Sequence, residues 1–202
     1  MNRIVSTLAL ALCTLAASST FAATKTYQAT LSGLNEATPV ITTGSGLVTF
    51  VFDDVANTLA VNAQFQNLLT PTTDAHIHCC TAQPFIGAVS VAVPMGGAFP
   101  LHVTSGSYNH VFDLGLTTSY TPGFLNTKGG GSAIGARDAL LAGIDANTAY
   151  FNIHTEGNPG GEIRGFLTAV PTSPVPEPQT YAMLGVGLAG VVLAARRKNL
   201  RG

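Results

Sequence analysis

Charged side chains are scarce in this 202-residue sequence, where they make up only 9% of the residues. Residues 23–175 contain four basic and nine acidic residues, so this segment carries a net charge near −5. The sequence therefore lacks the basic surface with interleaved aromatic residues that is typical of nucleic-acid binding, and we exclude that class. Proline and glycine are scattered without a period, so neither a collagen-like nor a disordered chain fits.

Catalytic motifs are lacking as well. The sequence has no nucleophile elbow, no phosphate-binding loop, no HExxH zinc motif and no carboxylate pair with a plausible partner. Asp53 and Asp54 are typical of a turn, with calcium binding as a minor alternative. Glu162 and Arg164 are two residues apart, and on a strand they would share a face as a structural ion pair. We therefore expect a protein that is not an enzyme.

The N-terminal segment is apolar, and residues 1–22 have the three parts of a secretory signal peptide. Arg3 supplies the positive charge, residues 4–17 form the apolar stretch, and Thr20-Phe21-Ala22 is a small-x-small cleavage site. The apolar run is shorter than a membrane span needs, so we expect cleavage after Ala22 rather than an uncleaved anchor.

The C-terminal segment has three parts in a fixed order. Residues 171–180 form a proline-rich linker that contains Val175, Pro176, Glu177 and Pro178. We predict a short transmembrane helix over residues 181–195, followed by a basic cytoplasmic tail over 196–202 that begins with Arg196 and Arg197. Because basic residues stay on the cytoplasmic side, the segment before the linker should lie outside the inner membrane.

This order resembles the PEP-CTERM sorting signal of Gram-negative bacteria. The resemblance implies recognition by an exosortase-type membrane protease, which cuts near the Pro-Glu-Pro sequence. The protein would then be anchored only transiently before it reaches the cell surface or is secreted. Proteins with such tails accompany exopolysaccharide production, so an exopolysaccharide or a surface protein is an expected partner.

The middle of the chain reads as a series of short strands. Polar and apolar residues alternate over 25–32 and 58–65, and about six further stretches have strand character with turn residues between them. Residues 134–144 have the spacing of the one plausible helix. About eight short strands indicate an all-β sandwich or a small barrel.

Reactive side chains concentrate in Asp74-Ala75-His76-Ile77-His78-Cys79-Cys80. On a strand His76, His78 and Cys80 would share one face, and His154 lies on the polar face of a later strand. If the two strands are neighbours, these four residues could bind copper or zinc. The alternative is that the histidines form hydrogen bonds to loop backbone or to carboxylates. Cys79 and Cys80 could instead form a disulfide, either with each other or with another chain.

Three sequence blocks resemble the CHRD domain, which is named for its repeats in chordin. They are Ala75-His76-Ile77-His78, the stretch from Ala149 to Thr155, and the stretch from Asn158 to Gly165. The resemblance implies that residues 23–170 form an immunoglobulin-like antiparallel β-sandwich with one short helix and no established enzymatic activity. We therefore expect an exported binding module of the cell surface or extracellular matrix. The alternative is a copper or zinc protein, with or without superoxide dismutase-like redox activity.

Overall fold

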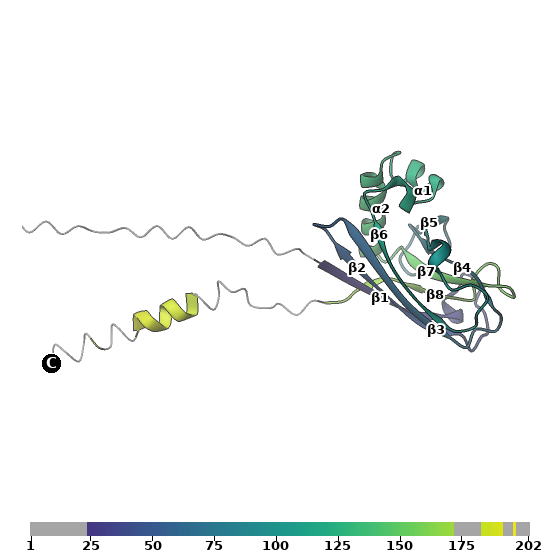
Figure 1. Ribbon diagram of the computed structural model, residues 1–202, viewed down its shortest axis with the longest axis horizontal. Helices are drawn as coiled ribbons and strands as arrows, with labels where there is room; N and C mark the ends of the chain where they lie inside the picture. The colour runs from purple at the N-terminus through teal and green to yellow at the C-terminus, as the bar shows by residue number, and fades with distance from the viewer. Residues whose placement is uncertain (1–23, 172–182, 192–195, 197–202) are drawn as a thin grey trace, which may run out of the picture.

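One antiparallel sheet dominates the part of the chain that the structure describes. The computed structural model describes residues 24–171, 183–191 and 196. The strands pair in the order β5-β4-β7-β8-β1-β2-β3-β6, and the short strand β9 pairs with β1. The sheet is strongly curled, with the helices α1 and α2 near β5 (Figure 1). The elements are β1 (Thr24–Ser32), β2 (Ser45–Asp53), β3 (Thr58–Gln66), β4 (Thr72–His78), β5 (Val91–Pro94), β6 (Gly106–Asp113), α1 (Pro122–Thr127), α2 (Ala133–Asp145), β7 (Tyr150–Thr155), β8 (Ile163–Phe166) and β9 (Thr168–Ala169).

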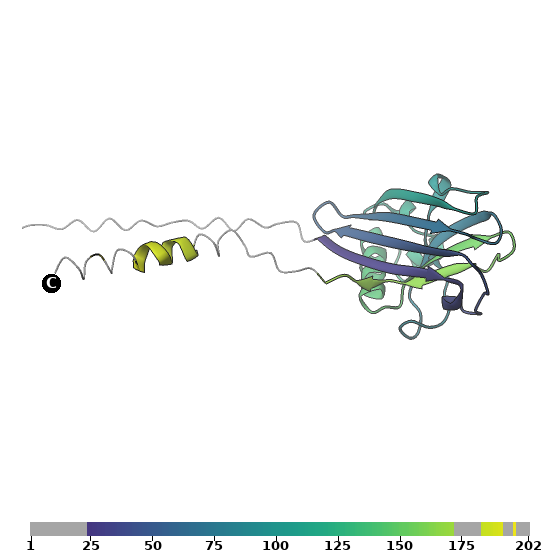
Figure 2. The same ribbon diagram turned by 90° about the horizontal axis from the view of Figure 1, so that it is seen from below.

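Side chains alternate in burial along the long strands, and the inner face of the curled sheet is apolar. In β3 the side chains of Leu59, Val61, Ala63 and Phe65 are buried, while the residues that alternate with them reach the surface. The strands β1, β2 and β3 lie side by side (Figure 2), and β1 and β2 show the same alternation. The strands predicted from sequence are therefore confirmed as elements, with modest shifts at their ends.

The strand pairing differs from the two-sheet immunoglobulin-like sandwich that we predicted. Strand β1 pairs with β2 on one side and with β8 and β9 on the other, so the two halves form one continuous sheet. The sheet curls until its two edges approach each other across the core. There the buried hydroxyl of Tyr108 in β6 donates a hydrogen bond to the carbonyl of Met95, just after β5, at 2.8 Å. A mostly β, antiparallel fold is confirmed, and its layering is that of one curled sheet.

Two helices pack beside the sheet, where the sequence predicted one. Helix α2 contains the predicted segment 134–144 and begins after Ser132, whose side chain caps it. Helix α1 lies outside the predicted segment. It begins because the hydroxyl of Thr121 accepts a hydrogen bond from the Phe124 amide and because Pro122 fixes φ at the first position.

Several predictions about the chain ends fall outside the described residues. They include the signal peptide at residues 1–22 and the motif residues from Val175 to Pro178. The predicted transmembrane segment is described only over residues 183–191, which are helical. Among the described residues, no helix combines the length and apolar character that are needed to cross a membrane.

A disulfide between the adjacent residues Cys79 and Cys80 packs against α2. Their Sγ atoms lie 3.8 and 3.6 Å from the carbonyl oxygen of Ala139. The peptide between the two cysteines is cis, and their Cα atoms are 3.2 Å apart, compared with about 3.8 Å across a trans peptide. Gly143 makes the close packing possible, because a Cβ at this position would overlap Cys79 Sγ and lie 2.8 Å from Cys80 Sγ.

We therefore expect Gly143→Ala to destabilise the fold by roughly 1–3 kcal/mol, because the added methyl group must displace the disulfide or the helix. The matched control is Gly123→Ala in α1, where an added Cβ meets nothing within 4 Å. The measurement is the free energy of unfolding from urea denaturation of both variants. Equal stability of the two variants would show that α2 does not rest tightly on the disulfide.

Candidate functional site

The pairing of β4 with β7 gathers three histidines on one face of the sheet. Asp74 lies opposite His154, His76 opposite Asn152, and His78 opposite Tyr150. Because side chains alternate along a strand, His76 and His78 point to the same side as His154. The apolar residues that alternate with the polar ones in β7 point to the other side and are fully buried in the core. The structure thus brings together His76, His78 and His154 as the sequence pattern predicted.

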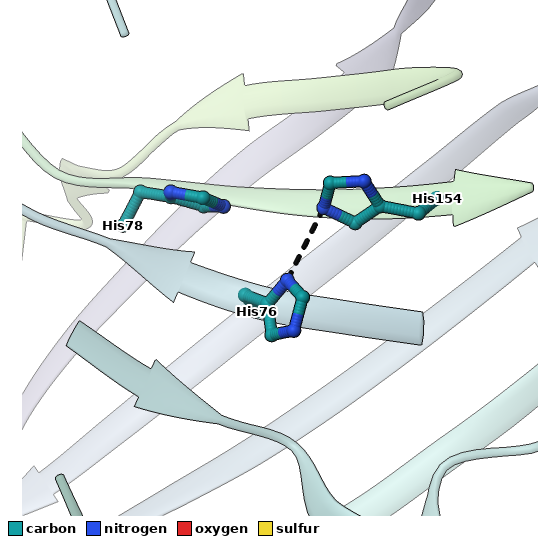
Figure 3. A group of neighbouring side chains, drawn as sticks. All are labelled: His76, His78 and His154. Atoms are coloured by element: carbon teal, nitrogen blue, oxygen red, sulfur yellow. Dashed lines mark hydrogen bonds between the residues drawn. The ribbon is translucent and has the colours of Figure 1, made fainter. Parts of the chain in front are cut away.

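The three imidazole rings of His76, His78 and His154 form a compact group, which we call the trihistidine cluster (Figure 3). One ring nitrogen from each residue lies within 4.8 Å of the other two. The closest pair is His76 Nδ1 and His154 Nε2, which are 3.1 Å apart. The ring of His78 directs a nitrogen toward the other two rings (Figure 3).

The second nitrogen of each ring faces a hydrogen-bond acceptor. His78 Nδ1 lies 2.7 Å from the carbonyl oxygen of Val89, and His154 Nδ1 lies 2.8 Å from that of Pro159. His76 Nε2 lies 3.0 Å from a carboxylate oxygen of Asp74. A nitrogen that faces a carbonyl or carboxylate oxygen at this distance carries its hydrogen. The outward nitrogens of the cluster are therefore donors.

Burial favours the neutral forms of His78 and His154. It lowers the pKa of His78 to about 4, and the neighbouring imidazoles and Arg164 act in the same direction. Burial also lowers the pKa of His154. His78 Nε2 is buried and has no hydrogen-bond partner among the described residues. At neutral pH this nitrogen presents a lone pair toward the other two rings.

A stack of planar groups connects His78 to a buried ion pair. The rings of His78 and Tyr150 are parallel within 6°, with centroids 4.7 Å apart, and the Arg164 guanidinium lies 4.6 Å from the Tyr150 centroid. Arg164 Nε lies 3.7 Å from a carboxylate oxygen of Glu36. Burial raises the pKa of Glu36 to about 7, although Arg164 and the hydrogen bond from Asn152 oppose this shift.

Glu162 does not pair with Arg164, in contrast to the ion pair suggested by their spacing. Its side chain is fully buried and accepts hydrogen bonds from the Thr42 hydroxyl at 2.6 Å, the Leu69 amide at 2.8 Å and the Thr155 hydroxyl at 2.8 Å. Glu162 thus joins two loops to the end of β7.

The structure does not bring Cys80 to the trihistidine cluster. Strand β4 ends at His78, and Cys80 Sγ is bonded to Cys79 Sγ beside α2. The alternation that would place Cys80 beside the histidines holds only while the strand continues.

Sequence reasoning missed the partners that orient the rings. Asp74 had a readable signal, since it lies two residues before His76 and so on the same face of the strand. The carbonyls of Val89 and Pro159 had none, because any residue supplies a backbone carbonyl. Tyr150 had only an indirect signal, because its place opposite His78 depends on the register of β4 against β7.

The low pKa of His78 gives the metal-free domain a specific pH dependence. Below the ordinary His pKa of 6.5 the unfolded chain takes up a proton that the folded state accepts only near pH 4. The free energy of unfolding should therefore fall as the pH drops from 6.5 to 4, by on the order of 3 kcal/mol from this residue. The raised pKa of Glu36 acts with the opposite sign between pH 4.5 and 7.

Comparing wild type with His78→Asn in the presence of a chelator isolates the His78 contribution, because Glu36 is present in both proteins. Urea denaturation at several pH values should show a smaller acid destabilisation in His78→Asn. The surface variant His110→Asn should behave like wild type. Equal pH profiles for wild type and His78→Asn would contradict a buried neutral imidazole at this position.

Comparison with known families and proteins agrees with the two resemblances that the sequence indicated. Residues 174–198 match the PEP-CTERM protein-sorting motif, which implies export and processing by an exosortase. No curated protein matches the chain. Residues 27–167, well over half of the sequence, match the CHRD domain, and the protein therefore belongs to the CHRD domain family.

Proposed function

We propose that this protein is an exported, non-enzymatic binding module of the cell surface or extracellular matrix. An exosortase-type protease would process its tail, and a matrix polysaccharide is its proposed ligand. The observation that carries the binding role is an open hollow of about 450 Å³ with exposed apolar walls and a polar floor, which we call the β1–β8 hollow. It is lined by Thr30, Leu34, Asn35, Glu36, Ala37, Phe85, Ile86, Gly87, Arg164 and Phe166.

Phe85 is the most distinctive residue of the β1–β8 hollow. Its side chain is 57% exposed, and its backbone has φ of 62°, a conformation that a bulky residue rarely adopts. Its ring contacts that of Phe166 at 6.0 Å between centroids, and the neighbouring Ile86 is 61% exposed. Exposed aromatic rings above a polar floor suit a ligand that has apolar faces and hydroxyl groups, such as a saccharide.

The first and last strands of the domain lie side by side, so the chain enters and leaves the domain at the same end. Tyr27 near the start of β1 pairs with Ala169 in β9, and the Val170 amide donates a hydrogen bond to Thr26 at 2.8 Å. Strand β1 runs from this end to Ser32, so the loops after Ser32 lie at the opposite end (Figure 2). A domain tethered just beyond Pro171 would hold those loops away from the membrane.

The hydrogen bonds of the trihistidine cluster also favour a non-enzymatic role. In the described domain the ring nitrogens of His76 face His154 and Asp74, and the other two rings bond to backbone carbonyls. None of these bonds reaches a hydroxyl or thiol group that a histidine could activate as a nucleophile.

The sorting proposal predicts that deletion of residues 176–178 leaves the tail uncut, because the protease has lost its recognition sequence. Mass spectrometry of the protein recovered from the producing cells measures the cleavage. A matched control deletes residues 171–173, which removes the same length of linker and leaves the motif intact. Identical processing of the two variants would contradict recognition of the Pro-Glu-Pro sequence.

The binding proposal predicts that Phe85→Asn weakens binding to polysaccharide isolated from the producing cells by about tenfold, the effect of losing one stacked ring. Asparagine tolerates positive φ, so the turn should survive the change. The control is Val111→Thr, which alters an equally exposed apolar residue on the distant edge strand β6. Affinity is measured from binding isotherms, and equal affinities for wild type and Phe85→Asn would contradict the proposed ligand site.

A further inference from the structure

We propose that the trihistidine cluster binds one divalent zinc or copper ion through His76 Nδ1, His78 Nε2 and His154 Nε2. Nothing in this proposal depends on the polysaccharide role, because the ligand atoms lie outside the β1–β8 hollow. It rests on the orientation of the three rings, on their outward hydrogen bonds and on one buried nitrogen that has no partner.

The outward hydrogen bonds decide which nitrogens have lone pairs. A neutral imidazole has one N–H and one lone pair, and the acceptors at Asp74, Val89 and Pro159 hold the N–H outward. With these N–H groups directed outward, the inward nitrogens are acceptors. His76 Nδ1 and His154 Nε2 then face each other at 3.1 Å, a contact that a proton or a metal ion between them makes favourable.

His78 provides the second and independent observation. Its side chain is only 9% exposed, yet Nε2 has no hydrogen-bond partner within the described domain. Buried polar atoms are normally paired, and an unpaired one that points toward two other imidazoles requires an explanation. A metal ion bound by all three inward nitrogens supplies it.

The outward partners also match those of known metal sites. A histidine that binds a metal usually donates its other N–H to a carboxylate or a backbone carbonyl, which fixes the ring and raises its basicity. Here Asp74 supplies a carboxylate to His76, while Val89 and Pro159 supply carbonyls to the other two rings. The rings are therefore preoriented for a ligand at the centre of the cluster.

The distances between the inward nitrogens allow them to bind one ion after the side chains adjust. Zinc–nitrogen bonds of about 2.0–2.1 Å at tetrahedral angles place the nitrogens about 3.3 Å apart. One pair is already at 3.1 Å, and all three nitrogens lie within 4.8 Å. Because the side chain of His76 is 16% exposed, a water molecule from solvent can complete the coordination.

The ligand set decides the class of metal. Three neutral imidazoles favour zinc or copper, whereas calcium and magnesium prefer oxygen ligands. The thiols that would add a soft ligand are joined in the Cys79–Cys80 disulfide. The Asp74 carboxylate and the acidic excess of the domain also favour a cation at this place.

Isothermal titration of the full chain with zinc sulfate or copper sulfate tests the proposal, after the protein has been treated with a chelator. We expect one equivalent to bind, and His76→Ala or His154→Ala to weaken binding at least 100-fold. Asp74→Asn should weaken it about 10–100-fold, since it removes only the group that orients His76. His110→Ala and Asp54→Asn are matched controls at exposed positions and should bind like wild type.

Electron paramagnetic resonance of the copper-loaded wild type provides a test that does not require any variant to fold. Hyperfine structure from three nitrogens is expected. The proposal is overturned by binding of less than about 0.1 equivalent at 10 μM free metal, by fewer than three nitrogen ligands, or by equal affinity of His76→Ala and His110→Ala. Failure of metal binding would leave the sorting and polysaccharide results unaffected.

Discussion

The register of β4 against β7 is the constraint on which the trihistidine cluster depends. With a slip of one residue, His76 and His78 would turn into the apolar core, because neighbouring side chains point to opposite faces. Two contacts support this register where β4 begins and β7 ends. The Glu156 amide donates to the Pro71 carbonyl at 3.0 Å, and the Glu162 carboxylate accepts from both Thr155 and the Leu69 amide. The contacts of these residues therefore both stabilise the fold and position the imidazoles.

The trihistidine cluster and the β1–β8 hollow share a wall. Arg164 lies over the ring of Tyr150 and lines the hollow. The same Tyr150 ring stacks on His78. The loop between β4 and β5 contacts both places, because the Gly87 carbonyl accepts from Arg164 at 2.9 Å and the Val89 carbonyl faces His78 Nδ1. A ligand in the hollow would thus contact the same loop that orients the His78 ring, although the hollow and the cluster have separate ligand atoms.

Periodic features of the fold could be predicted from sequence, while features set by long-range pairing could not. Alternation revealed most strands and placed His76, His78 and His154 on polar faces, since these patterns are local. The continuous sheet depends on β1 pairing with strands far away in sequence, which no local pattern encodes. Likewise, Arg164 pairs with Glu36 across 128 residues of chain rather than with Glu162, which lies just before β8. Helix α1 was missed because six residues are too few to show a period.

The adjacent cysteines change the chemistry expected of the site by leaving the strand. Continued alternation would have placed Cys80 beside the imidazoles, and the sequence then indicated a mixed nitrogen and sulfur ligand set. The chain instead turns after His78, and both sulfurs pack beneath α2 next to Gly143. The three residues from His78 to Cys80 therefore connect the trihistidine cluster directly to the disulfide that packs against α2. The trihistidine cluster therefore has no thiol ligand. Its metal-binding groups are three imidazoles, which one carboxylate and two carbonyls hold in place.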